Sequence, residues 1–489
     1  MSFRPTGYSF SSQYNKIITL RNPDGTPQLI MNSYGELVEK KKRVWDGWKR
    51  QCWKNKKRTY FPTGLYSLAT SELESAKLPY TAIDLRNKPS QDFDLSLSSD
   101  LIDRDYQIRV ADDSCENQRG IIQAATGSGK TAMAAMIMAR LNVSPFLFFV
   151  TSIDLLDQAK KELQKFLIHQ GSNLSVGQIG GGEIDIKDVN VLTVQTAYQA
   201  LGYKWDAKAK FDNDDTDDKT PIGERAKDIK ELINSAKGAI SDEIQHWRAK
   251  TCQDITREMK SCYYTYGMSA TPYRDEGDDL MIQACFGKKI AVITATELIE
   301  KGWLMAPNIK MVHLKKEKTK YAQWQSIYKD QVVENEYYNG VLANIANAYI
   351  EQDRLVLCLV QQITHGKILE SMIRGSMFLS GKSSKKKRLE SIQKLREKNI
   401  RCIVSTSIFD EGIDVKPLDT LVLAGQGKSK VRAMQRVGRT LRPFENKPNP
   451  TVIDPVLHQK YLKKHGIERI KMYRTEPAFC IEELDPNLR

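Results

Sequence analysis

The sequence lacks the features of a disulfide-stapled, zinc-binding or membrane-spanning protein. Its eight cysteines include no C-x-x-C pair, which argues against a disulfide framework or a zinc site and predicts reduced, mostly buried thiols. No stretch is long and apolar enough to span a membrane, and the first residues, Met1–Pro5, contain no apolar signal core. These absences predict a soluble, cytoplasmic protein with no membrane partner.

Length and charge indicate several domains and a polyanionic partner. A chain of 489 residues is too long for one ordinary domain, so we expect about two to four. The formal net charge of +14 points to nucleic acid first and to a membrane surface second. Residues 1–95 contain 16 Lys/Arg against 9 Asp/Glu, a net +7. Half of the excess positive charge therefore lies in the N-terminal part of the chain.

Basic and aromatic side chains are interleaved in this N-terminal region. The run Lys40–Arg43 precedes Trp45 and Trp48, and more basic residues and Trp53 follow. Such a surface can hold phosphates and offer flat faces for stacking on bases. Alternatively, the tryptophans belong to a core and the lysines are merely solvated. We favour DNA contact and predict a small α+β DNA-binding domain and linker over residues 1–95.

A glycine-rich loop at residues 124–131 predicts a phosphate-binding site. It contains the sequence Ala-Ala-Thr-Gly-Ser-Gly-Lys-Thr and precedes an Ala/Met-rich segment, 132–141, that we expect to be helical. Gly127 and Gly129 allow the backbone N–H groups to turn towards phosphate oxygens. Lys130 can then reach the outer phosphates, and the Thr131 hydroxyl can ligate Mg²⁺. The alternative is a tight turn before a surface helix, since Ala124 replaces the usual first glycine.

Two further motifs flank the loop. Upstream, Tyr106 precedes Gln107, whose amide can pair with both the donor and the acceptor on the adenine edge. Downstream, an expected strand at 237–241 leads into Asp242-Glu243. Asp242 can hold Mg²⁺, largely through water, and Glu243 can polarise the water that attacks a γ-phosphate.

Repeated strand–turn–helix patterns predict parallel α/β sheets. Expected strands include 145–150, 189–193 and 263–266 in a first unit, and 355–360, 400–405 and 418–423 in a second unit beginning near Ala306. An acidic run at about 206–220 has low hydrophobicity and lacks the glycine and terminal glutamate of a calcium loop. We therefore expect this run to be a disordered surface insertion.

A helix expected at residues 435–442 carries three arginines spaced three apart, Arg436, Arg439 and Arg442. This spacing places them along one face of the helix. A salt-bridged surface helix would have the same pattern. We favour arginines that reach into a shared cleft, where they can stabilise the charge of phosphoryl transfer.

In this order, the motifs resemble those of the superfamily-two helicases. The set comprises Tyr106-Gln107, Gly129-Lys130-Thr131, Thr151-Ser152, Asp242-Glu243, Ser269-Ala270-Thr271, Glu411-Gly412-Ile413-Asp414 and residues 435–442. The resemblance of the motor covers about residues 100–445. Segments at 45–47, 364–367, 423–430 and 461–470 also resemble bacteriophage members of the family.

The resemblance implies an α/β fold with two tandem RecA-like parallel-sheet lobes. The first lobe, which binds ATP and contains the acidic insertion, is expected at 96–305, and the second at 306–450. A short helical C-terminal extension is expected at 451–489.

The resemblance also implies roles for individual residues, with ATP and Mg²⁺ as cofactors. The catalytic set would be Glu243 as base, Arg439 and Arg442 as arginine fingers, and Gln435. Nucleotide contacts would come from Tyr106, Gln107, Gly127, Ser128, Gly129, Lys130, Thr131, Gly412 and Asp414, and metal contacts from Thr131 and Asp242. Nucleic-acid contacts would come from Thr151, Thr196 and Thr406 in the lobes and from Lys41, Lys42, Arg43 and Trp45 in the N-terminal domain.

One departure from the family pattern lies beside the acidic pair. Gln245 occupies a position where close relatives have histidine, a side chain that helps to couple the nucleotide site to lobe motion. Gln245 can still hydrogen-bond through its amide, so we expect ATP hydrolysis to be retained. The sequence leaves open whether hydrolysis is coupled to lobe motion.

The function implied is that of an ATP-dependent DNA helicase, monomeric, in phage recombination, repair and replication. Its partners would be branched or forked DNA, Holliday junctions and RNA–DNA hybrids in R-loops, and its location the host cytoplasm if a phage encodes it. Three alternatives stay open: a DNA-stimulated translocase that remodels DNA without processive unwinding, the motor subunit of a restriction enzyme, and a degenerate binding or annealing protein. The intact Lys130, Asp242 and Glu243 argue against the last of these.

Overall fold

The computed structural model describes most of the chain from Tyr60 onward and, before that, the backbone of eight short strands. From Tyr60 the described residues are 60–205, 218, 220–247, 249–272, 279–315, 319, 321, 323–381, 383–406, 417–425, 437–438, 440–445 and 447–484. The chain divides into two compact units, residues 1–81 with 273–288, and residues 82–272 with 289–489.

The first unit contains four antiparallel strand pairs. The pairs are β1 (Ser2–Phe3) with β6 (Lys49–Arg50), β2 (Lys16–Thr19) with β5 (Lys41–Val44), β3 (Leu29–Met31) with β4 (Leu37–Glu39), and β7 (Trp53–Lys54) with β8 (Thr59–Tyr60). A short 3₁₀ turn, Thr63–Leu65, leads into α1 (Tyr66–Ser75). Helix α8 (Asp279–Phe286) packs on that turn, although it lies some two hundred residues further along the chain. No pattern in the sequence indicates that residues 273–288 belong with the N-terminal region.

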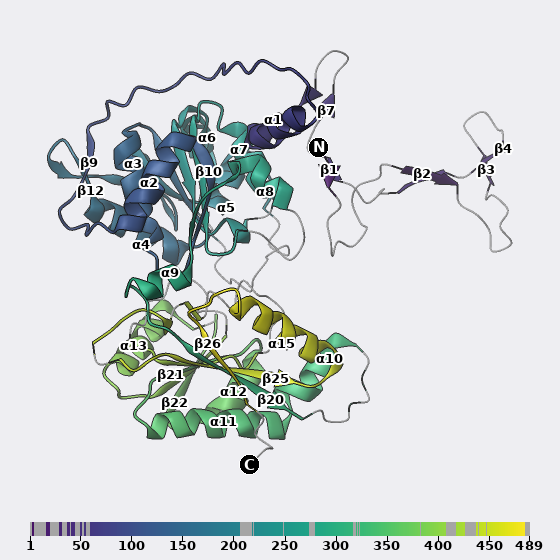
Figure 1. Cartoon of the computed structure of the whole chain (residues 1–489), viewed down its shortest axis with the longest axis vertical. Coiled ribbons are helices and arrows are strands. Elements are labelled where there is room, and N and C mark those ends of the chain that lie inside the picture. Colours follow the sequence, from purple (N-terminus) through teal and green to yellow (C-terminus); the bar gives the residue numbers. More distant parts are fainter. Residues whose placement is uncertain are drawn as a thin grey trace. The chain divides into compact units, whose positions relative to one another are not determined.

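The second unit contains two large sheets, and the first has eight strands (Figure 1). Its order is β15 (Glu183–Asp185), β14 (Val176–Gly180), β16 (Val189–Thr193), β11 (Phe146–Val150), β17 (Gly238–Ser241), β18 (Tyr264–Ser269), β10 (Arg119–Ala124) and β19 (Lys289–Ile293). All neighbours are parallel except β14 and β15. The inner strands β11, β16, β17 and β18 are buried along their whole length, as expected for a parallel sheet covered on both faces, whereas the edge strand β19 exposes Val292. A small antiparallel sheet of β9 (Leu95–Leu97), β12 (Leu167–His169) and β13 (Ser172–Asn173) accompanies this lobe.

The second sheet has seven strands, all parallel. Its order is β22 (Ser376–Leu379), β23 (Cys402–Ser405), β21 (Val356–Leu359), β24 (Thr420–Val422), β25 (Thr451–Leu457), β20 (Asn308–Leu314) and β26 (Cys480–Leu484). The two large sheets confirm the predicted pair of parallel α/β lobes. The second lobe does not end at residue 450 as expected, because β25 and β26 are strands of its sheet. Between them lies α15 (Lys460–Tyr473), the helix expected in the C-terminal segment.

Helices flank both sheets (Figure 1). The first lobe carries α2 (Asp105–Asn117), α3 (Lys130–Leu141), α4 (Ile153–Phe166), α5 (Val194–Ala200), α6 (Ala226–Ser235), α7 (Ala249–Glu258) and α9 (Ala295–Glu300). The second carries α10 (Trp324–Tyr328), a π-turn at Lys329–Val333, α11 (Glu336–Glu351), α12 (Ile363–Met372), α13 (Lys385–Arg396) and α15. Several begin at a side-chain cap, as where Ser152 accepts the Leu155 N–H and Asn335 the Tyr338 N–H.

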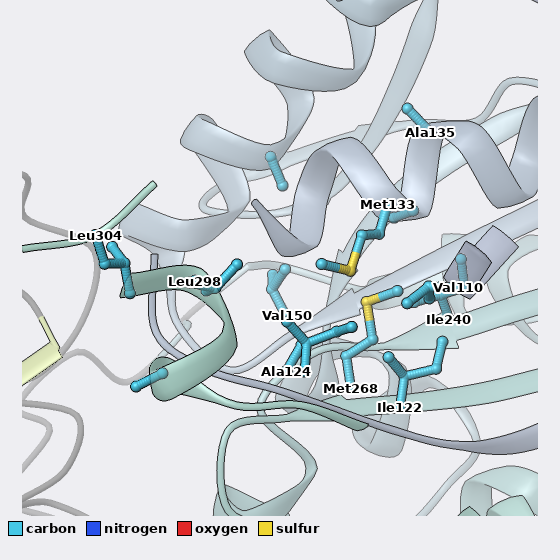
Figure 2. Packing of buried hydrophobic residues seen from close by; sticks show 14 of the residues in the cluster. Val110, Ile122, Ala124, Met133, Ala135, Val150, Ile240, Met268, Leu298 and Leu304 are labelled. Carbon is cyan, nitrogen blue, oxygen red and sulfur yellow. The ribbon is translucent and has the colours of Figure 1, made fainter. Parts of the chain in front are cut away.

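A continuous apolar core supports the phosphate loop. Ala124, the last residue of β10, is fully buried among side chains that include Ile122, Val150 and Met268 (Figure 2). Met133 of α3 packs into the same cluster. The turn between β10 and α3 therefore packs on a close-packed apolar core, which fixes the direction of its backbone amides.

Cysteine placement agrees with the sequence interpretation. Five of the seven described cysteines are buried, Cys115 is half-buried and Cys480 is exposed, and none forms a disulfide within the described ranges. In the part of the chain that the structure describes, no helix has the length and apolarity needed to cross a bilayer.

Candidate active site

The loop between β10 and α3 has the geometry expected for phosphate binding. Gly127 and Gly129 adopt left-handed backbone conformations, with φ of +89° and +81°. The Ser128 N–H donates to the Ala125 carbonyl at 3.1 Å, which closes the turn. A Cβ on Gly129 would also lie 2.6 Å from Gln107 Nε2, so the buried Gln107 side chain would have to shift. The loop needs glycine for its conformation and for its contact with α2.

Tyr106 and Gln107 hold the loop from α2. Both side chains are buried and both donate to the Ser128 carbonyl, at 2.9 Å from Tyr106 and 3.0 Å from Gln107. Gln107 Oε1 is buried and has no hydrogen-bond partner among the described residues. A buried amide oxygen without a partner suits a ligand that donates, as the adenine amino group does.

The acidic pair follows β17 and faces the loop. The Asp242 N–H donates to the Phe149 carbonyl at 2.9 Å, which ties the pair to the neighbouring strand β11. Lys130 Nζ hydrogen-bonds Glu243 Oε1 and lies 3.7 Å from Asp242 Oδ1. Glu243 itself has φ of +47°, an unusual conformation for a residue with a side chain and one often found at functional sites.

Asp242 and Thr131, the residues expected to hold Mg²⁺, both carry side-chain oxygens. Burial, together with the neighbouring Glu243 carboxylate, raises the pKa of Asp242 to about 6, against the attraction of Lys130. A buried carboxylate of this kind is stabilised by a bound cation. Thr131, half-buried, is the second residue of α3, beside Lys130. The two side chains supply the hard oxygen ligands that Mg²⁺ prefers.

Gln245 joins the acidic pair to a neighbouring strand. Its Nε2 donates to Glu243 Oε2 at 2.6 Å, and its Oε1 accepts from the Ser269 hydroxyl. Ser269 Oγ in turn accepts the Thr271 N–H at 2.9 Å. The Gln245 amide therefore uses both of its ends, one on Glu243 and one on the residue that ends β18.

Arg442 is brought to the phosphate loop. A Cβ on Gly127 would lie 3.8 Å from Arg442 Cγ and 3.9 Å from its Nε. The preceding residue, Leu441, accepts the Met305 N–H at 2.8 Å. The other residues expected from the second lobe, Gln435, Arg439, Gly412 and Asp414, lie outside the described residues.

The three threonines expected to contact nucleic acid differ in their surroundings. Thr151 Oγ1, after β11, is buried without a hydrogen-bond partner in the described part of the chain. Thr406 is half-buried at the end of β23. Thr196 is fully buried, and its hydroxyl donates to the Asp218 carboxylate at 2.6 Å. In the N-terminal unit, Lys41, Lys42 and Arg43 lie on β5, of which only the backbone is described, and Trp45 is outside the described residues.

Asp218 departs from the expectation for the acidic insertion. The sequence predicts a disordered surface segment for the whole run, but Asp218 is 3% exposed and makes several hydrogen bonds. The departure has a physical reason: threonine hydroxyls and backbone N–H groups satisfy the buried carboxylate. No local pattern in the sequence distinguishes this aspartate from its acidic neighbours. Ser269, by contrast, lies in a motif visible in the sequence, but its contact with Gln245 was not foreseen.

Two family models match the chain. The model described as "Type III restriction enzyme, res subunit" matches residues 100–274, and "Helicase conserved C-terminal domain" matches residues 341–443. The matches cover the phosphate loop, the acidic pair and the segment of Arg442. Together they span more than half of the chain.

Curated relatives are similar over most of this chain. "Putative helicase 22" of Sulfolobus islandicus filamentous virus (isolate Iceland/Hveragerdi) is 27% identical over 383 residues, 73% of this chain and 64% of that protein. "DNA 3'-5' translocase XPB2" of Sulfurisphaera tokodaii is 26% identical over 382 residues, 69% of this chain and 78% of that protein. "ATP-dependent DNA helicase uvsW" of Enterobacteria phage T4 is 24% identical over 402 residues, 76% of this chain and 75% of that protein.

Solved structures share the fold. The type ISP restriction-modification enzyme LlaBIII bound to DNA matches with a TM-score of 0.55 and 16% identity, over 79% of this chain and 32% of that chain. The DUF1998 helicase MrfA bound to DNA matches with a TM-score of 0.55 and 14% identity, over 79% of this chain and 50% of that chain. These likenesses support the assignment of the two sheets as RecA-like lobes. With its two helicase domains, the chain belongs to the superfamily-two helicases and resembles UvsW of phage T4.

Proposed function

We propose that this protein is an ATP-dependent DNA helicase that acts on branched DNA, with ATP and Mg²⁺ bound at the loop between β10 and α3. The observation that carries the proposal is the hydrogen-bonded series from Lys130 through Glu243 and Gln245 to Ser269. In this proposal Lys130 is the phosphate-binding cation, Glu243 the base and Gln245 the amide that positions it, and the hydrogen bonds that join them support these roles. Such an arrangement suits phosphoryl transfer to water.

In the proposed mechanism, Lys130 exchanges its contact with Glu243 for the outer phosphates of ATP. Glu243, still held through Oε2 by Gln245, then accepts a proton from the attacking water through its freed oxygen. Asp242 and Thr131 would hold Mg²⁺, which neutralises charge on the phosphate oxygens. Arg442, with Arg439, would stabilise the charge of the transferred group from the second lobe.

The buried amide of Gln107 selects the base in this proposal. Its Nε2 is committed to the Ser128 carbonyl, so the orientation of the amide is fixed and Oε1 is left to accept. Adenine presents a donor at this edge, whereas guanine presents a carbonyl there. A buried acceptor facing another acceptor loses its hydrogen bond, so ATP should be preferred over GTP.

The likeness to the phage T4 protein named as an ATP-dependent DNA helicase supports DNA as the substrate. Branched DNA as the preferred form, and roles in phage recombination, repair and replication, are part of the proposal. The basic N-terminal region and the net charge of +14 suit a polyanion held without sequence preference. The proposal also includes RNA–DNA hybrids as substrates, a monomeric state and a cytoplasmic location.

The proposal is tested by measuring ATP hydrolysis with single-stranded, duplex, forked, four-way and R-loop substrates. We expect nucleic acid to stimulate hydrolysis, branched DNA to stimulate it most, and forked DNA to be unwound. Glu243→Gln should abolish turnover while leaving DNA binding intact. A wild-type protein that hydrolyses ATP with none of these substrates would refute the enzyme assignment.

A second candidate is a translocase that moves on DNA without processive unwinding. It is favoured by the likeness to the archaeal protein named as a 3'-5' translocase. Displacement of streptavidin from biotinylated DNA without strand separation on a fork would select this candidate. A third candidate, a restriction-enzyme motor, is raised by the description of the first family model and predicts cleavage of DNA when a nuclease subunit is added.

A further inference from the structure

Asp218 is a buried carboxylate whose oxygens are both saturated by donors. Oδ2 accepts from the hydroxyls of Thr193 and Thr196, at 2.5 and 2.6 Å. Oδ1 accepts from the Gly181 N–H at 3.2 Å and from the N–H and hydroxyl of Thr220, at 3.1 and 2.5 Å. Five donors on one side chain make it among the most completely hydrogen-bonded carboxylates in the described structure.

The donors contributed by the lobe come from three separate elements that meet at one end of the sheet. Thr193 ends β16, Thr196 lies in α5, and Gly181 follows β14. Gly180 completes the enclosure by having no side chain, because a Cβ there would lie 2.7 Å from Asp218 Oδ2. Its φ of +134° also disfavours any other residue. We call Thr193, Thr196 and the Gly181 N–H the anion cradle.

The anion cradle stabilises negative charge without a cation. Burial by itself raises the pKa of Asp218, but hydrogen bonds from Thr193, Thr196 and Thr220 outweigh it, so the pKa is lowered. Among the described residues, no Lys, Arg or His forms an ion pair with this carboxylate. Hydroxyls and a backbone N–H also suit a phosphodiester, which carries one negative charge on two free oxygens as a carboxylate does.

We propose that Asp218 is an internal mimic of a DNA phosphate, which occupies the anion cradle in the free protein and is displaced when a DNA strand binds to the first lobe. This proposal rests on the proposed function, because it requires that the lobe binds a strand. The Asp218 contact then acts as an autoinhibitory latch. It lowers the affinity for DNA in proportion to the small fraction of molecules in which the cradle is open.

The competing interpretation is a purely structural one, in which Asp218 anchors the end of the acidic segment on the sheet. Its backbone supports this anchoring, since the Asp218 N–H and carbonyl both pair with the Gln195 side chain, at 3.2 and 2.9 Å. The two interpretations predict opposite effects on DNA affinity. Loss of a latch tightens binding, whereas loss of an anchor lowers stability and does not tighten binding.

The test uses the full-length chain and a fluorescent single-stranded oligodeoxythymidylate, with Kd measured by anisotropy in the absence of nucleotide. Asp218→Ala removes the competitor, and Asp218→Asn retains its size without its charge. The matched control is Asp185→Asn, which makes the same charge change at a side chain on nearby β15 that pairs with Lys187 in solvent. Thermal unfolding is measured for each variant.

We expect Asp218→Ala to lower the Kd by about three- to tenfold, and Asp218→Asn to lower it less, with Asp185→Asn close to the wild type. The DNA concentration for half-maximal ATPase should fall with the Kd, and kcat at saturating DNA should not change. Adding Thr196→Val to Asp218→Ala should remove the gain, because the cradle itself would then be impaired.

The proposal is overturned if Asp218→Ala and Asp218→Asn bind the oligonucleotide no more tightly than Asp185→Asn, or if the gain survives Thr196→Val. If Asp218→Ala fails to fold, Asp218→Asn decides the question alone. A wild type whose ATPase does not respond to DNA would instead refute the proposed function. The two failures are therefore distinguishable.

Discussion

The first lobe contains two anion sites, which stabilise negative charge with different kinds of donor. At the phosphate loop, Lys130 carries full positive charge and is held by the Glu243 carboxylate. At the anion cradle, the donors are neutral and are held by the Asp218 carboxylate. In both sites a carboxylate of the protein accepts the hydrogen bonds that we propose a bound phosphate accepts in its place.

The difference between the sites follows from the ligand that each is proposed to hold. A nucleotide triphosphate carries several charges and is bound once per cycle, so a lysine and a metal are needed to neutralise it. A strand has to be gripped and released repeatedly, and neutral donors bind a single phosphodiester less tightly.

Lys130→Ala should lower the rate of ATP hydrolysis by about a thousandfold or more at every DNA concentration. The reason is that this ammonium stabilises the charge on the outer phosphates during transfer. Thr193→Val, at the other site, should raise the DNA concentration needed for half-maximal hydrolysis and preserve kcat. Steady-state kinetics with DNA and ATP varied independently separate the two. Equal losses of kcat in both variants would mean that the sites do not have separate roles.

Gln245→Leu should lower kcat by about ten- to a hundredfold with little change in the KM for ATP, since Glu243 would lose the donor that orients it. Gln245→His is the matched variant, because an imidazole can restore part of the link between Glu243 and Ser269. Single-turnover hydrolysis measures the chemical step. An unchanged rate in Gln245→Leu would show that Glu243 needs no such positioning.

Replacing Lys40, Lys41, Lys42 and Arg43 by alanine should weaken DNA binding by about tenfold. The slope of log K against log salt should also fall, by about one for each phosphate that the variant no longer neutralises. Anisotropy titrations across a salt series provide the measurement. Lys386→Ala combined with Lys387→Ala on α13 is the control, because the Lys386 side chain is 88% exposed. An unchanged salt slope in the first variant would show that the run Lys40–Arg43 is an ordinary solvated surface that does not contact DNA.

Glu243→Gln should bind ATP about threefold more tightly than the wild type, although it cannot hydrolyse it. Lys130 would no longer be held by a carboxylate, so a larger fraction of molecules would have it available for phosphate. Equilibrium binding of a fluorescent ATP analogue measures this effect. Weaker binding would indicate that Glu243 positions Lys130 instead of competing for it.

The parts of the fold and site that the sequence predicted are those encoded locally. The strands expected at 145–150, 189–193 and 237–241 are β11, β16 and β17, because a buried parallel strand is a short apolar run whatever its neighbours are. The turn at Gly127 and Gly129 was equally visible, since left-handed backbone conformations favour glycine. Motif order then sufficed to indicate the family.

The tertiary structure alone decided which residues far apart in sequence share a site or a sheet. β25 lies between β24 and β20, and nothing within residues 451–457 specifies those neighbours. Gln245 acquires its role from Ser269, and Asp218 acquires its burial from Thr193 and Thr196. A carboxylate in an acidic run is solvated by default. It becomes a buried, ionised group only when folding brings enough donors to replace its water.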